Sequence, residues 1–103
     1  MTNAYGLPLT AFQQINAVFS RYPQIKQVIL YGSRAKGNYR NGSDIDLTIK
    51  GTIDLSTLLK IEQELDDLLL PWSVDLSVLA QIDNLELVEH IKRRGQVFYQ
   101  APE

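Results

Sequence analysis

Residues 30–49 read LYGSRAKGNYRNGSDIDLTI: the end of an apolar strand, a basic loop containing glycines, and a second apolar alternation. The first strand ends abruptly at Gly32-Ser33. Glycine at a strand end lets a ligand approach the backbone closely, and the N–H groups of such a turn, with a short helix starting there, attract anions. Two carboxylates, Asp44 and Asp46, open the second strand. The stretch therefore predicts a phosphate site beside a divalent-metal site.

The two aspartates are two residues apart in a predicted strand over residues 44–50. Side chains i and i+2 of a strand lie on one face, so Asp44 and Asp46 point one way while the apolar residues between and after them enter the core. A later predicted strand, over residues 72–79, repeats this alternation and carries Asp75 on its polar face. If the two strands are neighbours, three carboxylates come together.

Such a cluster is unfavourable by itself. Two carboxylates about 5 Å apart repel each other by roughly 3 kcal/mol at an effective dielectric constant of about 20, so either one holds a proton or a cation lies among them. Oxygen-only ligands suit Mg²⁺, which commonly takes one or two carboxylates and completes its shell with substrate phosphate oxygens. A single aspartate of this kind is more simply a turn residue or part of a solvated sheet face; the combination with the glycine turn favours the metal site.

These residues resemble a known family. Gly32-Ser33, ten further residues, Asp44-x-Asp46 and a later Asp75 form a pattern similar to that of the polymerase-beta-type nucleotidyltransferase superfamily, and above all of its minimal nucleotidyltransferase (MNT) proteins. The resemblance extends from about Phe12 to Tyr99. It implies an enzyme that transfers a nucleoside monophosphate, AMP from ATP in the first instance or from another NTP, to an acceptor hydroxyl with the help of two Mg²⁺ ions.

The three carboxylates are the predicted catalytic residues and metal ligands. Asp44 and Asp46 are expected to hold the metal on the nucleotide side and to share the other ion. Asp75 is expected to complete the second metal's shell and to lower the pKa of the acceptor hydroxyl or take its proton.

The predicted nucleotide-binding residues lie in the loop. Gly32 and Ser33 are expected to orient the β- and γ-phosphates, while Arg34 and Lys36 offer positive charge to the transition state. The alternative for the basic side chains is that they only keep the loop soluble. Tyr31 fits either stacking on a base or ordinary packing, and packing is the simpler interpretation.

A protein partner is expected. Only 28 residues follow Asp75, enough for one helix and one strand, which leaves little surface for holding an acceptor in attack geometry. MNT-like proteins are typically paired with a helical HEPN protein, so the resemblance implies a HEPN-type partner, an antitoxin role, and transfer of AMP to a tyrosine of that partner. A homodimer and a heterotetramer both stay open; nucleic acid and membrane are not expected as partners.

Two other functions stay open. One is a non-catalytic nucleotide-binding module that neutralises or scaffolds a helical partner by contact. The other is a small-molecule nucleotidyltransferase that acts as a homodimer.

Composition sets broad limits. The chain of 103 residues, with 45% hydrophobic and 21% charged residues, is expected to form one nucleotidyltransferase domain over residues 1–103. Absence of cysteine excludes disulfides and thiol chemistry. No apolar run approaches the roughly 18 residues needed for a membrane span, and the start shows no signal peptide, so a cytoplasmic protein is expected.

The rest of the chain predicts alternating elements. Helical periodicity marks three helices, of which the second has Leu55, Leu58, Ile61, Leu65, Leu68 and Leu69 on its inward face. The three are expected over about residues 8–21, from an Asp54 cap to Pro71, and from an Asp83 or Asn84 cap to Gly95. Strands are expected at 25–31, 44–50, 72–79 and, at a sheet edge, 96–100. The order predicts an α/β (α+β) domain with a small mixed β-sheet, helices on one face and the carboxylate active site on the other.

Overall fold

The computed structural model describes residues 3–40 and 42–102. Its main sheet has four strands in the order β5-β4-β3-β6. They are β3 (Ile25–Tyr31), β4 (Ile45–Gly51), β5 (Val74–Val78) and β6 (Gln96–Gln100). β4 is antiparallel to β3 and parallel to β5, while β6 is antiparallel to β3. The predicted class and the small mixed sheet are confirmed, with the last strand at an edge.

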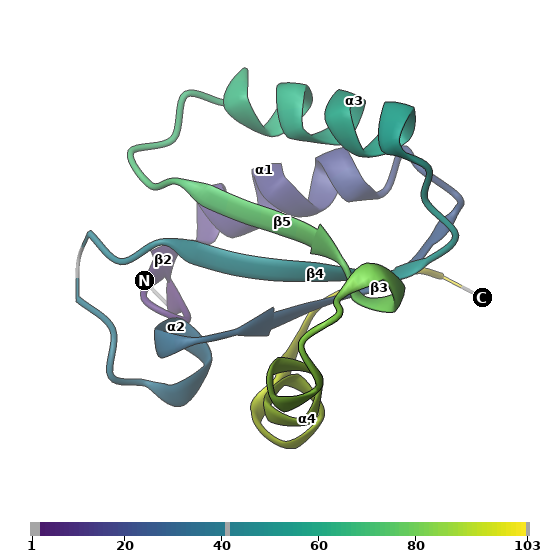
Figure 1. The fold of residues 1–103 in the computed structure, drawn as a ribbon. Coiled ribbons are helices and arrows are strands. Elements are labelled where there is room, and N and C mark those ends of the chain that lie inside the picture. The colour runs from purple at the N-terminus through teal and green to yellow at the C-terminus, as the bar shows by residue number, and fades with distance from the viewer. Residues whose placement is uncertain (1–2, 41, 103) are drawn as a thin grey trace.

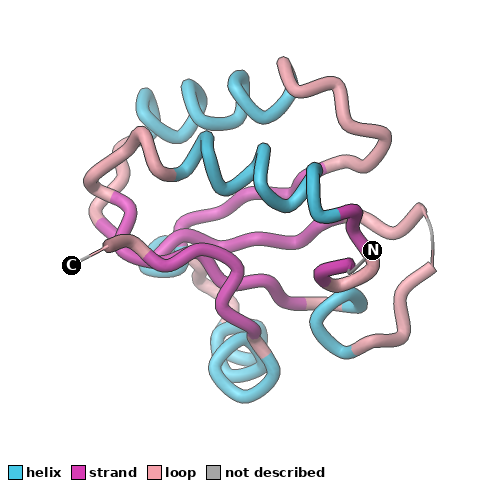
Figure 2. Tube along the Cα trace, turned by 180° about the vertical axis from the view of Figure 1, so that it is seen from behind, coloured by secondary structure: helices cyan, strands magenta, loops and turns pink. Residues whose placement is uncertain are grey.

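Helices lie on both faces of this sheet. α1 (Leu9–Phe19) and α3 (Leu55–Asp66) cover one face, and α4 (Leu85–Arg94) lies against the other (Figure 1). The view from behind shows the same two layers around the sheet (Figure 2). The short α2 (Ser33–Lys36) follows β3, and the single 3₁₀ turn η1 (Leu79–Gln81) links β5 to α4. Within the part of the chain that the structure describes, no helix is long and apolar enough to cross a membrane.

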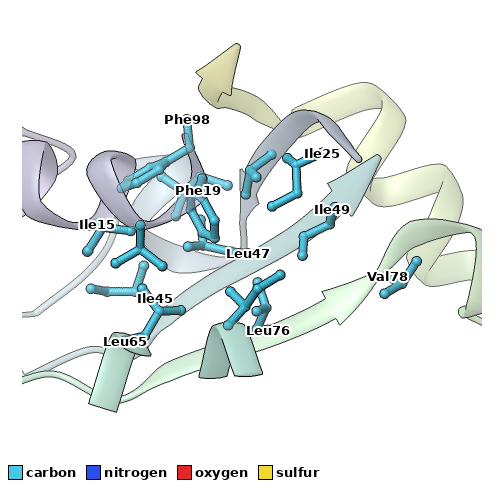
Figure 3. Close-up of a cluster of buried hydrophobic side chains, with 14 of the residues drawn as sticks. Ile15, Phe19, Ile25, Ile45, Leu47, Ile49, Leu65, Leu76, Val78 and Phe98 are labelled. Atoms are coloured by element: carbon cyan, nitrogen blue, oxygen red, sulfur yellow. The ribbon is translucent and has the colours of Figure 1, made fainter. Parts of the chain in front are cut away.

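The core lies between the sheet and the pair α1 and α3. Alternate residues of β4 point into it, namely Ile45, Leu47 and Ile49, all fully buried. They meet buried side chains from both helices and from β5, including Ile15, Phe19, Leu65 and Leu76 (Figure 3). This period-two burial of β4 leaves its polar side chains on the opposite face, as the sequence predicted.

The position of α4 differs from the prediction. It packs on the carboxylate face of the sheet, because Ile29 and Val97 project there and line one apolar site with Ile91 of α4. Two expected core residues are also outside the core: Leu55 is 68% exposed and Leu69 is 87% exposed. α3 ends at Asp66, one turn before Pro71, so Leu69 lies beyond the helix.

A small hairpin near the N-terminus was not predicted. β1 (Asn3–Ala4) pairs with β2 (Leu7–Pro8) across a turn in which Tyr5 and Gly6 both have positive φ. A β-carbon at Gly6 would lie 2.2 Å from the ring of Tyr39, so the hairpin packs directly on the loop before β4. This contact brings the hairpin next to the predicted phosphate loop.

Candidate active site

Two of the predicted carboxylates lie side by side. β4 and β5 are parallel neighbours, and Asp46 is the direct register partner of Asp75. On the other side of β4, Tyr31 is the register partner of Asp46. Register partners point to the same face of a sheet, so these three side chains form one row across the face opposite α1 and α3. Two of the three carboxylates that the sequence predicted to converge, one from each strand, therefore lie together on this face.

The glycine turn packs against this row. Gly32 has φ 77° and ψ −155°, a conformation almost confined to glycine. A β-carbon on residue 32 would lie 2.3 Å from Oδ2 of Asp46, so the carboxylate occupies the space that any other side chain would need. α2 starts directly after this residue, and the N–H of Lys36 donates to the Gly32 carbonyl. The turn and the carboxylate therefore form one compact unit.

The electrostatics of Asp46 reflect this setting. Burial raises the pKa of the Asp46 carboxyl, and the negative charges of Asp75 and Asp44 raise this pKa further. Asp44, which is exposed, lies just before β4 and is thus close enough to act on its neighbour. Three mutually repelling carboxyl groups with one partly buried favour a bound cation.

The pair Asp46 and Asp75 fits a hard metal ion that completes its ligand shell from the substrate. Among residues 3–40 and 42–102, no three acidic or histidine side chains are arranged as a complete metal-ligand group. The in-register pair Asp46 and Asp75 does supply two oxygen donors on one face, and Mg²⁺ usually takes one or two carboxylates together with substrate phosphate oxygens. The donor set therefore matches a metal that arrives with a nucleotide.

Arg34 is not placed for phosphate binding, which corrects its predicted role. The side chain is only 2% exposed. Its Nε and Nη2 donate to the carbonyl of Ser43, at 3.1 and 2.9 Å, and its Nη1 donates to the carbonyl of Tyr5 at 3.0 Å. The guanidinium also lies over the rings of Tyr39 and Trp72. Arg34 therefore ties the N-terminal hairpin to the residue that precedes Asp44.

The other predicted loop residues remain accessible. Lys36, in the same short helix, is exposed, and Ser33 is half-buried at its start. Of the two cations that were expected to serve the nucleotide, Lys36 is the one whose side chain faces solvent. Gly32 and Ser33 lie where the turn meets the carboxylate row.

The hydroxyl groups of Tyr31, Thr48 and Ser77 lie on the carboxylate face, and no role for them beside the carboxylates was predicted from the sequence. The hydroxyl of Ser77 donates to the hydroxyl of Thr48, which is fully buried, at 2.9 Å. Burial raises the pKa of the Tyr31 hydroxyl and the charges of Asp75 and Asp46 raise it too, while a hydrogen bond with Ser77 acts in the opposite direction. The hydroxyl of Tyr31 thus faces the carboxylates. The sequence feature that could have indicated this is the position of Tyr31, which immediately precedes the glycine turn and lies at the level of the second aspartate.

Comparison with known proteins agrees with this geometry. A family model described as polymerase beta, nucleotidyltransferase matches residues 13–103. The chain belongs to this nucleotidyltransferase family. It is therefore an enzyme of the nucleotidyl-transferring class.

A curated relative supports the assignment. A Methanocaldococcus jannaschii protein, provisionally named a protein adenylyltransferase, is 35% identical over 72 residues, which make up 69% of this nucleotidyltransferase and 69% of the relative.

Solved structures share the fold. A crystal structure described as a toxin–antitoxin with AMP-PNP matches with a TM-score of 0.70 at 22% identity, over 87% of this chain and 73% of that one. A Shewanella oneidensis structure, a tri-AMPylated HEPN toxin in complex with MNT antitoxin, matches with a TM-score of 0.66 at 20% identity, over 90% and 72%. A nucleotidyltransferase-like protein from Sulfolobus solfataricus matches less closely, with a TM-score of 0.54 at 20% identity, over 87% and 77%.

Proposed function

We propose that this nucleotidyltransferase moves AMP from ATP to a tyrosine hydroxyl on a HEPN-type helical partner and acts as that partner's antitoxin. The observation that carries the proposal is the in-register pair of Asp46 and Asp75 beside Gly32. The provisional naming of the archaeal relative as a protein adenylyltransferase favours AMP and a protein acceptor. The AMPylated toxin bound to an MNT antitoxin favours a HEPN partner.

Each residue has a proposed role. Asp44, Asp46 and Asp75 would hold Mg²⁺, which when bound neutralises charge on the phosphates and on the attacking oxygen. Gly32 and Ser33 offer backbone N–H groups and a hydroxyl to the terminal phosphates, and exposed Lys36 offsets their charge.

The reaction is a single displacement. The acceptor oxygen forms a bond to the α-phosphorus while the bond from that phosphorus to the bridging oxygen of pyrophosphate breaks. Asp75, which is exposed on the edge strand, takes the proton of the acceptor hydroxyl and later gives it to solvent.

An acceptor on a separate protein agrees with the exposure of the site. Asp75 is the exposed member of the register pair, whereas Asp46 is partly buried against the turn. The nucleotide would therefore occupy the inner part of the row and the acceptor the outer part, at β5.

The test uses ATP labelled in the α-phosphate, Mg²⁺ and a candidate HEPN protein. We expect label on the partner with the wild-type chain and none with Asp44→Ala/Asp46→Ala. A matched control, Asp83→Ala/Glu89→Ala, removes two exposed acids that belong to neither β4 nor β5 and should retain transfer. Inhibition of the partner that survives the first double change without any label would instead favour the contact-only module.

A further inference from the structure

A groove follows the outer edge of β5 beneath α3. Two adjoining cavities, of about 380 Å³ and about 230 Å³, share Leu65, Asp66 and Val74 in their walls. Glu62 and Asp66, four residues apart and hence neighbours on one side of α3, form an acidic wall along the groove. Neither carboxylate has a cationic partner within 4 Å in the described residues, where Arg21 with Glu64 is the ion pair present.

On this side, β5 has no neighbouring strand among residues 3–40 and 42–102. β5 lies at the end of the strand order and pairs with β4 on its inner side. The N–H of Ile45 donates to the carbonyl of Ser73 at 2.9 Å. Peptide groups alternate in direction along a strand, so the N–H and C=O groups of Val74 and Leu76 point away from β4. An open strand edge of this kind can pair with an extended peptide.

The side chains of β5 connect this edge to the chemistry. Asp75 points to the carboxylate face, while Val74 and Leu76 point to the α3 side. A strand added beside β5 would lie about 4.8 Å away. Its residue opposite Asp75 would project onto the carboxylate face beside that carboxylate, and the residues before and after it would project toward the acidic wall.

We propose that the acceptor protein binds as an extended segment along the outer edge of β5, with its tyrosine opposite Asp75 and with lysine or arginine at the adjacent positions facing Glu62 and Asp66. This inference rests on the proposed function, because it assigns that reaction its acceptor site. Charge complementarity selects a basic segment, and the alternation of side chains fixes the basic residues at the positions next to the tyrosine. The strand edge contributes affinity through main-chain hydrogen bonds, and the groove selects which side chains bind.

The first test measures binding of fluorescent peptides. One peptide has tyrosine between two lysines and the other has tyrosine between two glutamates, in the same neutral extended sequence. Wild type should bind the lysine peptide about tenfold more tightly, as expected when two unlike pairs replace two like-charge pairs. Glu62→Lys/Asp66→Lys should remove or reverse this preference, whereas Glu89→Lys, an exposed change on α4, should retain it. Equal binding of both peptides to wild type, or an unchanged preference in the double variant, would overturn the proposal.

A second measurement tests strand pairing itself. Successive N–H groups of an added strand point alternately to β5 and to solvent, so N-methylation of the peptide at one of two consecutive positions should weaken binding and at the other should not. Equal effects at both positions would also overturn the proposal.

The same peptides separate this inference from the proposed function. AMP transfer without any flanking preference would retain the proposed function and reject the docking site. The predicted binding pattern with no AMP transfer from ATP and Mg²⁺ would reject the proposed function while the docking surface stands.

Discussion

Gly32 and Asp46 are in such close contact that a β-carbon on residue 32 would lie 2.3 Å from Oδ2 of the carboxylate. The turn that would hold phosphate and the side chain that would hold metal therefore share one space. A substitution in the turn moves the carboxylate, although the two residues lie on different elements.

Gly32→Ala should abolish most activity. The change forces an alanine into a conformation that costs on the order of 1–3 kcal/mol and displaces Asp46. A misplacement of about 1 Å at the reacting groups commonly lowers rates about 100-fold. Steady-state AMP transfer measures this loss.

Gly37→Ala is the matched control. Gly37 also has positive φ, at 87°, but among the described residues a β-carbon there would meet no atom within 4 Å apart from those of its chain neighbours. It should cost about 1 kcal/mol of stability and leave transfer nearly unchanged. Equal loss of transfer in both variants would show that backbone strain, and not contact with Asp46, controls the site.

Asp46→Asn should stabilise the ligand-free protein. The folded-state pKa of Asp46 is raised by burial and by Asp75 and Asp44, so the stability of the protein falls as pH rises from the unfolded pKa through the folded one. Asparagine carries no ionisable carboxyl, so this loss of stability with rising pH is absent in the variant. At neutral pH we expect a gain on the order of 1 kcal/mol, or about 4–8 °C in melting temperature, and no gain at a pH below the unfolded value.

The same variant should lose the response to ligand. Mg²⁺ with a non-hydrolysable ATP analogue should raise the melting temperature of wild type through binding, but not that of Asp46→Asn. Exposed Asp83→Asn is the control for removal of a charge and should behave as wild type. A lower melting temperature for ligand-free Asp46→Asn would contradict mutual repulsion among the carboxylates.

The carboxylate row was predictable because it depends on local periodicity. Alternation in β4 and β5 places Asp46 and Asp75 opposite the apolar residues whatever the connections are, and the register of two neighbouring strands then pairs them. Asp54 caps α3 as predicted, accepting from the N–H of Thr57. Of the two candidate caps for α4, Asp83 and Asn84, it is Asn84 that accepts from the N–H of Leu87.

Arg34 and α4 were not predictable in this way, because their positions depend on distant partners. Arg34 turns inward to the carbonyls of Tyr5 and Ser43, and Tyr5 belongs to a hairpin too short to show periodicity. α4 packs on the carboxylate face because Ile29 provides an apolar surface there. The apolar sequence of β3 indicates that both faces of this strand are buried, but it does not indicate which element covers each face.

Arg34→Met should act through stability. It removes a buried cation that satisfies two carbonyl groups, a loss of about 2–4 kcal/mol, and it frees the residue before Asp44. Exposed Lys36→Ala in the same helix should leave the melting temperature unchanged and raise the KM for ATP about tenfold, as loss of one charged phosphate contact predicts. Thermal unfolding and KM measurements together distinguish the two roles; a raised KM with normal stability for Arg34→Met would return Arg34 to the phosphate site.

Tyr31→Phe should slow transfer while preserving the fold. The hydroxyl that it removes belongs to the register partner of Asp46. Burial raises the pKa of this hydroxyl, so it stays protonated and can donate a hydrogen bond at the carboxylate row. Loss of one such bond should lower kcat about tenfold with little change in KM for ATP. Because the pKa of this hydroxyl is raised, the ratio of wild-type to variant kcat should stay constant from about pH 6 to 9.

Tyr99→Phe removes a hydroxyl from a half-buried ring that packs on Phe19, away from the site, and should leave kcat unaltered. If the Tyr31→Phe and Tyr99→Phe variants have the same kcat, Tyr31 serves only packing, which is the simpler interpretation of an aromatic residue at a strand end.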